Sequence, residues 1–83
     1  ELRALKIDGL IRGESFLNRQ FKRNGYAQRI YIGTPQVSNW GVYGIWVNDE
    51  LFYIGSTMRD FKVRFDEHRE NLRTRRGELY IYS

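Results

Sequence analysis

Two short runs of β-branched and aromatic residues constrain the fold of this chain more than any other feature of its sequence. The runs occupy residues 42–47 and 51–55, and three polar residues, Asn48, Asp49 and Glu50, separate them. Runs of this composition joined by a short polar loop are typical of an antiparallel β-hairpin. We therefore predict strands over 42–47 and 51–55, and residues 79–82 predict the start of a third strand.

A helical pattern follows the predicted hairpin. Asp60 lies where an N-cap belongs, and Gly77 lies where a left-handed C-cap would end a helix. Residues that recur at helical spacing lie between them, at Phe61, Phe65, His68 and Leu72. We predict a helix over 60–76 that packs with the small antiparallel sheet, which makes the fold class α+β.

The first forty residues predict an N-terminal helical extension. Residues 14–24 place Leu17 and Phe21 four positions apart among polar residues, and Gly25 follows where a helix would end. Pro35 lies in a predicted turn, and residues 29–32 are compatible with an edge strand or an extended arm. The predicted organisation is therefore a helical extension over 1–40 and a second part over 41–83.

Length and composition exclude several classes of protein. A chain of 83 residues makes one small domain or a part of a longer polypeptide, and its first residue is Glu1 rather than methionine. It contains no cysteine, which excludes disulfides and thiolate zinc sites and suits a reducing compartment. Its apolar runs are far too short to span a bilayer. We expect an intracellular protein, cytoplasmic or nucleoid-associated, with no membrane partner.

The positive charge is concentrated in two blocks. Residues 1–33 carry seven basic and three acidic side chains, and residues 59–76 carry seven basic and four acidic ones, within a net charge of +4. Arginine supplies six of the seven cations in the second block, and its planar fork suits phosphate oxygens. An ordinary solvated helix face with ion pairs is the alternative interpretation, and for an isolated charge run it is the more frequent one.

Two tripeptides and a pair of helical residues occur in one ordered arrangement. Gly41-Val42-Tyr43 is followed, after nine residues, by Tyr53-Ile54-Gly55, and the predicted helix then carries Arg64 and His68 four positions apart. This combination resembles the GIY-YIG nuclease family. An earlier copy, Tyr31-Ile32-Gly33, lacks a first tripeptide at a suitable distance and lacks the following helix, so we interpret it as coincidental.

The resemblance implies a metal-dependent endonuclease that hydrolyses DNA phosphodiester bonds. It covers residues 41 to about 76, and it implies an antiparallel sheet packed against helices and one divalent metal ion, expected to be Mg²⁺. The family's metal ligand is a glutamate on a later helix, which we expect beyond residue 83; no metal ligand is assigned within the chain. The residues that match the family's catalytic positions are Tyr43, Tyr53, Arg64 and His68.

The matched residue types suit phosphodiester cleavage. Arg64 can clamp a phosphate with a forked group that is always charged. A tyrosine has an ordinary pKa of about 10, so Tyr43 would act as a base only with a nearby cation or a metal-bound water. His68 lies one helical turn beyond Arg64 and could bond the tyrosine or the phosphate.

Four further residues are predicted to contact nucleic acid. Gly55 and Ser56 end a strand where the backbone must pass close to substrate. Arg59 and Lys62 lie near the start of the predicted helix as candidate phosphate contacts, although surface cations are equally often only solvated.

The shared site requires one particular strand register. A two-residue hairpin loop would place Tyr43 opposite Ile54 and send Tyr53 to the other face of the sheet. A three-residue loop, or a bulge of equivalent effect, places Tyr43 opposite Gly55 and aligns both tyrosine rings on one face. We predict the second register.

A second class of function is also compatible with the sequence. In this alternative, the chain is a catalytically inactive module that binds nucleic acid or protein through its arginine-rich helix and lacks the metal-binding glutamate. The basic extension over 1–40 would add grip on the DNA backbone in either case.

Overall fold

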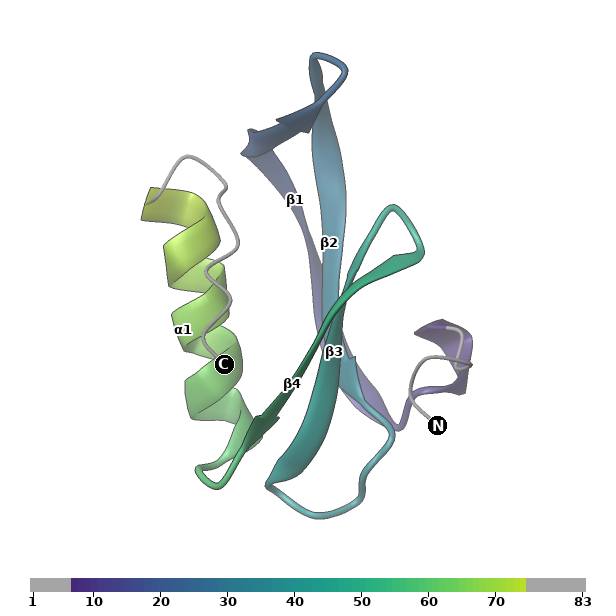
Figure 1. The fold of residues 1–83 in the computed structure, drawn as a ribbon, viewed down its shortest axis with the longest axis vertical. Helices are drawn as coiled ribbons and strands as arrows, with labels where there is room; N and C mark the ends of the chain where they lie inside the picture. The colour runs from purple at the N-terminus through teal and green to yellow at the C-terminus, as the bar shows by residue number, and fades with distance from the viewer. Residues whose placement is uncertain (1–6, 75–83) are drawn as a thin grey trace.

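A computed structural model describes residues 7–74, which form a four-stranded antiparallel sheet with one helix on its face (Figure 1). A short 3-10 helix, η2 (Ile7–Gly9), precedes the strands β1 (Arg12–Arg23), β2 (Tyr26–Thr34), β3 (Gly41–Val47) and β4 (Glu50–Thr57). The helix α1 (Phe61–Thr74) follows, and the strand order in the sheet is β1-β2-β3-β4. The α+β class and the predicted hairpin are thus confirmed. The predicted third strand over 79–82 and the end of the predicted helix after residue 74 lie outside the described residues.

The predicted N-terminal helical extension is wrong, because residues 14–24 belong to a β-hairpin. β1 pairs with β2 along most of its length, with Phe16 opposite Ile30 and Glu14 opposite Ile32. Asn24 and Gly25 have φ angles of 58° and 82°, which makes them the tight turn between the strands. Asn-Gly with positive φ at both positions is the preferred two-residue hairpin turn. The glycine that resembled a helix cap is therefore a turn residue.

Residues 29–32 lie in an interior strand. β2 pairs with β1 on one side and with β3 on the other, where Ile30 lies opposite Val47 and Ile32 opposite Ile45. Both isoleucines are fully buried. The two strands before Gly41 and the two after it therefore share one continuous sheet.

The β3–β4 hairpin combines a two-residue turn with a bulge. Next to the turn, Val47 lies opposite Glu50 and Asn48 and Asp49 have φ angles of 50° and 70°. The register then shifts between Ile45 and Trp46, because Phe52 has no partner on β3. Beyond the bulge, Tyr43 lies opposite Gly55 and Tyr53 opposite Ile45. The predicted alignment of the two tyrosines is confirmed, and a bulge produces it.

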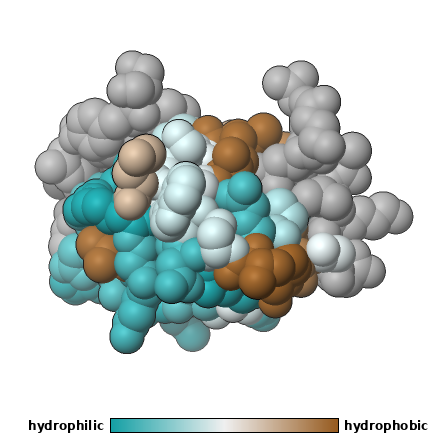
Figure 2. Space-filling view, turned by 90° about the horizontal axis from the view of Figure 1, so that it is seen from below, coloured by the Kyte–Doolittle hydropathy of each residue, from teal (hydrophilic) through white to brown (hydrophobic). Residues whose placement is uncertain are grey.

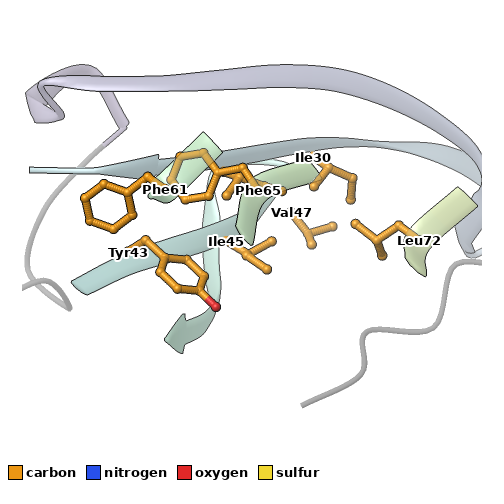
Figure 3. Close-up of a cluster of buried hydrophobic side chains, with 8 residues drawn as sticks. Ile30, Tyr43, Ile45, Val47, Phe61, Phe65 and Leu72 are labelled. Atoms are coloured by element: carbon orange, nitrogen blue, oxygen red, sulfur yellow. The ribbon is translucent and has the colours of Figure 1, made fainter. Parts of the chain in front are cut away.

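The core fills the space between α1 and one face of the sheet (Figure 3). Asp60 caps the helix as predicted, since its Oδ1 accepts a hydrogen bond of 2.8 Å from the backbone N–H of Lys62. The helix then turns one face inward, with Phe61, Phe65 and Leu72 packed on the strands. The strand residues of this core are Ile30, Ile32, Tyr43, Ile45 and Val47.

The lower end of the molecule has a mixed surface. Figure 2 shows this end, where apolar patches are separated by hydrophilic ones. Val37 in the β2–β3 loop and Met58 in the β4–α1 loop are among its exposed apolar residues. The apolar side chains visible from this direction therefore do not merge into one continuous surface.

Candidate active site

The structure brings the four predicted catalytic residues together between the sheet and α1. Tyr43 comes from β3, Tyr53 from β4, and Arg64 and His68 from successive turns of α1. The ring centroids of Tyr43 and Tyr53 lie 6.2 Å apart, and those of Tyr53 and His68 lie 5.6 Å apart. We call these four residues the catalytic cluster. Its assembly depends on the β4 bulge, which turns Tyr53 toward the helix.

A chain of hydrogen bonds runs through the hydroxyl of Tyr43. Arg64 Nε donates to Tyr43 Oη at 3.2 Å, and Tyr43 Oη lies 2.7 Å from His68 Nε2. Burial, and to a lesser degree the charge of Arg64, lowers the pKa of His68 to about 4. The imidazole is therefore neutral near pH 7 and can accept at Nε2. Because a guanidinium only donates, the arrangement that satisfies all three groups runs from Arg64 to Tyr43 to His68.

Tyr43 holds its proton firmly in this state. Burial raises the pKa of its phenol to about 12, although the hydrogen bond and charge of Arg64 act in the opposite direction. The side chain is 0% exposed. The cation that the sequence analysis required beside Tyr43 is present, but desolvation outweighs it.

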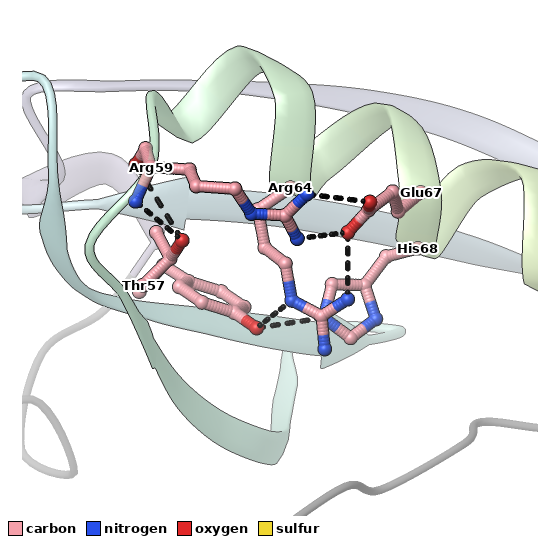
Figure 4. A network of polar contacts seen from close by, with 6 residues as sticks. Thr57, Arg59, Arg64, Glu67 and His68 are labelled. Atoms are coloured by element: carbon pink, nitrogen blue, oxygen red, sulfur yellow. Dashed lines mark hydrogen bonds and ion pairs between the residues drawn. The ribbon is translucent and has the colours of Figure 1, made fainter.

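A network of ion pairs holds the guanidinium of Arg64 (Figure 4). This network was not predicted from the sequence. Arg64 Nη1 donates to Glu67 Oε1 at 3.0 Å, and Arg59 donates to both oxygens of Glu67 at 2.9 and 2.6 Å. Hydrogen bonds from Arg59 and then Arg64 lower the pKa of Glu67 to about 2. The three-residue spacing of Arg64 and Glu67 on a helix was the available sequence signal.

The catalytic cluster reaches the surface through Arg64. An open groove of about 360 Å³ is lined by Arg64, Glu67, Glu70 and Asn71. The Arg64 side chain is 15% exposed, whereas His68 is 1% exposed. Arg64 therefore lies between this groove, which we call the Arg64 groove, and the buried hydroxyl of Tyr43.

The four residues predicted to contact nucleic acid do not form one surface. Gly55 is buried under the Tyr43 ring, where a Cβ would lie 2.5 Å from Tyr43 Oη. Ser56 is exposed on β4, and Arg59 is held by Glu67. Lys62 lines a different cleft of about 350 Å³, between the start of α1 and β1. The structure thus gives Gly55 a steric role, since it leaves room for the tyrosine opposite.

The described residues do not fit a metal centre. Within residues 7–74, no group of three or more His, Asp or Glu side chains is placed to hold an ion. Both oxygens of Glu67 accept hydrogen bonds from arginine, and His68 Nε2 is bonded to Tyr43. The predicted metal ligand, a glutamate expected beyond residue 83, lies outside the described residues.

Comparison with known proteins gives one match. A family model described as the GIY-YIG catalytic domain matches residues 39–80, just over half of the chain. The matched segment contains β3, β4 and all four residues of the catalytic cluster. No curated protein and no solved structure matches the chain. Among the described residues, no helix is long and apolar enough to cross a membrane.

Proposed function

Because this chain belongs to the GIY-YIG family, we propose that it is an endonuclease that hydrolyses phosphodiester bonds of double-stranded DNA. The observation that carries the proposal is the hydrogen-bonded chain from Arg64 through Tyr43 to His68. It places a fixed cation, a phenol and a neutral imidazole in contact beside a groove that opens to solvent.

Arg64 is the proposed phosphate clamp. It lines the Arg64 groove, and its guanidinium now donates to the carboxylate of Glu67. A phosphodiester in the groove presents two non-bridging oxygens that share one negative charge, as the oxygens of a carboxylate do, so it can replace Glu67 as the acceptor. Charge that develops on the phosphate oxygens in the transition state is then stabilised by the guanidinium.

Tyr43 and His68 are the proposed path for the proton of the attacking water. Movement of Arg64 toward a phosphate uncovers the Tyr43 hydroxyl on the groove side. The water oxygen then bonds to phosphorus while its proton passes to Tyr43 Oη and the tyrosine proton passes to His68 Nε2. The bond from phosphorus to the leaving oxygen breaks, and the leaving oxygen takes a proton from bulk water. This relay avoids a free phenolate, which agrees with a Tyr43 pKa of about 12.

The relay requires a neutral His68, which burial provides. A histidine with a pKa of about 4 carries no proton on its accepting nitrogen at neutral pH. The imidazolium that forms after proton transfer lies near Arg64 and is disfavoured there, so it passes the proton back through Tyr43 to solvent after the product leaves, which balances the proton taken by the leaving oxygen. Tyr53 contacts both rings and keeps them aligned.

A non-cutting module that binds nucleic acid is the second candidate. One observation favours it, because Glu67 neutralises both Arg59 and Arg64 at the groove. If this network does not open, Arg64 cannot take a phosphate. DNA would then bind without being cleaved.

Cleavage of supercoiled plasmid by the complete protein tests the proposal. The assay compares Mg²⁺, Mn²⁺ and EDTA, and compares wild type with Tyr43→Phe and Arg64→Ala. We expect each substitution to lower the cleavage rate by at least about 100-fold. Circular dichroism must show that both variants remain folded. Equal cleavage by wild type and both variants would contradict the proposed site, and binding without cleavage by wild type would support the second candidate.

A further inference from the structure

The β1–β2 hairpin extends past the rest of the sheet. Strand pairing between β2 and β3 begins at Ile30 and Val47, and the backbone of Arg29 still bonds Asn48 of the β3–β4 turn, so the backbone of residues 26–28 is paired with β1 alone. Figure 1 shows the tip of this hairpin projecting at the upper end of the molecule, beyond the β3–β4 turn. We call residues 19–29 the ribbon.

The base of the ribbon is fixed to the fold. Three residues of β1 after Asn18 lie opposite no residue of β2, which makes a wide bulge. Asn18 Oδ1 accepts hydrogen bonds from the backbone N–H groups of Gln20 and Phe21 at 2.8 and 3.0 Å. Its Nδ2 donates to the carbonyl of Leu72 in the last turns of α1. The direction in which the ribbon projects is therefore set by the helix that carries the catalytic cluster.

An aromatic contact also fixes the bulge of β1 that follows Asn18. The Phe21 ring packs edge-on against Phe52 at 6.0 Å, and Phe52 is the bulged residue of β4. The two bulges thus meet across the sheet. A two-residue turn with positive φ at Asn24 and Gly25 closes the ribbon. A ribbon constrained at both ends loses little conformational entropy when it binds.

The ribbon carries cations that no carboxylate neutralises. Arg19, Lys22 and Arg29 are exposed, and none makes an ion pair within residues 7–74. By contrast, the arginines of α1 with described side chains are all paired with glutamates, Arg64 with Glu67, Arg69 with Glu14 and Arg73 with Glu70. The available positive charge is therefore concentrated on the ribbon more than on the arginine-rich helix.

We propose that the ribbon is a DNA-binding arm that lies in the major groove beside the cleaved phosphate. The B-form major groove is about 12 Å wide and admits a two-stranded β-ribbon. Arg19, Lys22 and Arg29 would contact phosphates, while the exposed Gln20 and Asn24 can reach base edges. The 75% exposed Tyr26 lies at the tip. This inference rests on the proposed function in one respect, that the substrate is duplex DNA.

The salt dependence of binding tests the cationic part of the proposal. Fluorescence anisotropy with a labelled DNA duplex, in EDTA to prevent cleavage, compares wild type with Arg19→Gln/Lys22→Gln/Arg29→Gln. Each lost phosphate contact should reduce the slope of log K against log salt by about 0.9, or about 2.7 for the three. At 0.15 M salt the affinity should fall on the order of a hundredfold. An unchanged slope would overturn the proposal.

A matched pair of single substitutions separates ribbon charge from total charge. Arg29→Gln and Arg73→Gln each remove one arginine, but Arg73 is already paired with Glu70 at 2.5 Å. The first should reduce the slope by about 0.9 and the second should change it little. Equal effects would contradict a specific role for the ribbon. Because the substituted side chains are exposed, the thermal unfolding midpoints should match wild type.

Chemical probing tests the groove assignment. Dimethyl sulfate modifies guanine N7, which lies in the major groove. Wild type should protect guanines that the triple variant leaves reactive. A-form RNA duplex of the same sequence should bind more weakly, since its major groove is too narrow for the ribbon. Binding without N7 protection, or equal binding of the RNA, would overturn the major-groove assignment.

The outcomes distinguish the arm from the nuclease. If wild type cleaves plasmid and the triple variant binds and cleaves equally well, the arm is wrong and the nuclease stands. If wild type binds DNA with the expected slope but does not cleave it, the nuclease is wrong and the arm stands. If wild type does not bind duplex DNA, both are wrong.

Discussion

The chain contains the tripeptide Tyr-Ile-Gly twice, on β2 and on β4, and the two copies face opposite sides of the same sheet. Ile32, Ile45 and Tyr53 lie in one cross-strand row, and Tyr31 and Trp46 lie in the next. Tyr53 therefore points toward α1, where it contacts His68. Tyr31 points away from α1 and packs against Trp46 at 6.0 Å. Identical local sequence thus gives two environments that differ only through strand register.

The bulge at Phe52 is the cause of the difference. Without this extra residue, the register next to the turn would continue and Tyr53 would face away from α1, as Tyr31 does. The comparison teaches that strand register, and not the tripeptide itself, decides which tyrosine lies beside Tyr43 and His68. The β2 copy therefore serves as an internal control for the β4 copy.

The largest difference between the copies should appear when each tyrosine ring is removed. Tyr53→Ala should lower kcat/KM for plasmid cleavage by about a thousandfold, equivalent to about 4 kcal/mol, because the Tyr53 ring packs against both Tyr43 and His68 and keeps them aligned. Tyr31→Ala should leave the kcat/KM of the folded protein within about twofold of wild type. Steady-state kinetics on both variants would measure this. Similar losses in the two variants would remove the distinction between the copies.

The next largest expected effect is a pH dependence of folding stability. It arises on the side of the sheet that Tyr53 faces, where His68 is the buried histidine of the described residues. The unfolded chain binds a proton at His68 near its ordinary pKa of 6.5, while the folded protein resists protonation down to about pH 4. The unfolded state therefore binds more protons between these values, so stability falls as pH decreases through this window. The loss should approach about 3 kcal/mol at pH 4.

Urea denaturation across pH 7 to 4 would measure this loss. His68→Gln should flatten the dependence between pH 6.5 and 4.5. Glu67→Gln should change that range little, because Glu67 loses most of its contribution between its ordinary pKa of 4.5 and its folded pKa of about 2. A wild-type stability that stays constant from pH 6.5 to 4.5 would contradict the buried neutral histidine.

Gly33→Ala and Gly55→Ala should have similar effects on folding stability but different effects on the cleavage rate. A Cβ at Gly55 would meet the Tyr43 ring, and one at Gly33 would meet the Tyr31 ring. Both substitutions should destabilise the protein by about 1–3 kcal/mol through overpacking. Gly55→Ala alone should also lower cleavage by about tenfold or more in the folded protein, since it displaces Tyr43 Oη from His68 and Arg64. Equal activities at a temperature where both variants are folded would contradict this.

The smallest effect concerns the turns that follow β1 and β3. Glycine occupies the second turn position at Gly25, with φ 82°, whereas Asp49 occupies it in the second hairpin, with φ 70°. Asp49→Gly should stabilise the protein by about 0.5–1 kcal/mol because glycine adopts positive φ without steric cost. Gly25→Asp should destabilise it by a similar amount. The urea midpoints of the two variants measure these changes. Midpoints that shift in the same direction would contradict the prediction.

The β3–β4 hairpin and α1 were predicted correctly because their sequences contain several local patterns that agree. The β3–β4 hairpin has β-branched strands and a polar turn, and α1 has a cap at Asp60 that the structure confirms. The residues of the catalytic cluster followed from the ordered motif. Requiring Tyr43 and Tyr53 to share a face also predicted the register beyond the bulge.

The N-terminal half could not be predicted from local pattern alone. Leu17 and Phe21 suit a helix by spacing, but β1 gains its hydrogen bonds and its burial from β2. The Asn24-Gly25 pair is typical of a hairpin turn, but Gly25 was interpreted as the end of a helix. The link from Arg59 through Glu67 to Arg64 was also missed, because it requires a loop residue to fold back beside the helix.

The amino-acid order by itself determined which chemical groups this protein can use: two phenols, a guanidinium and one imidazole at spacings typical of one nuclease family. Tertiary structure alone decided that a bulge brings the two phenols onto one face, that Glu67 pairs with the guanidinium, and how strongly each group holds its proton. The physical reason is that side-chain identity is local, whereas strand register and desolvation arise from contacts between distant segments. The pKa of Tyr43 shows this, since Gly55, Arg64 and His68 enclose it from two other elements of the fold.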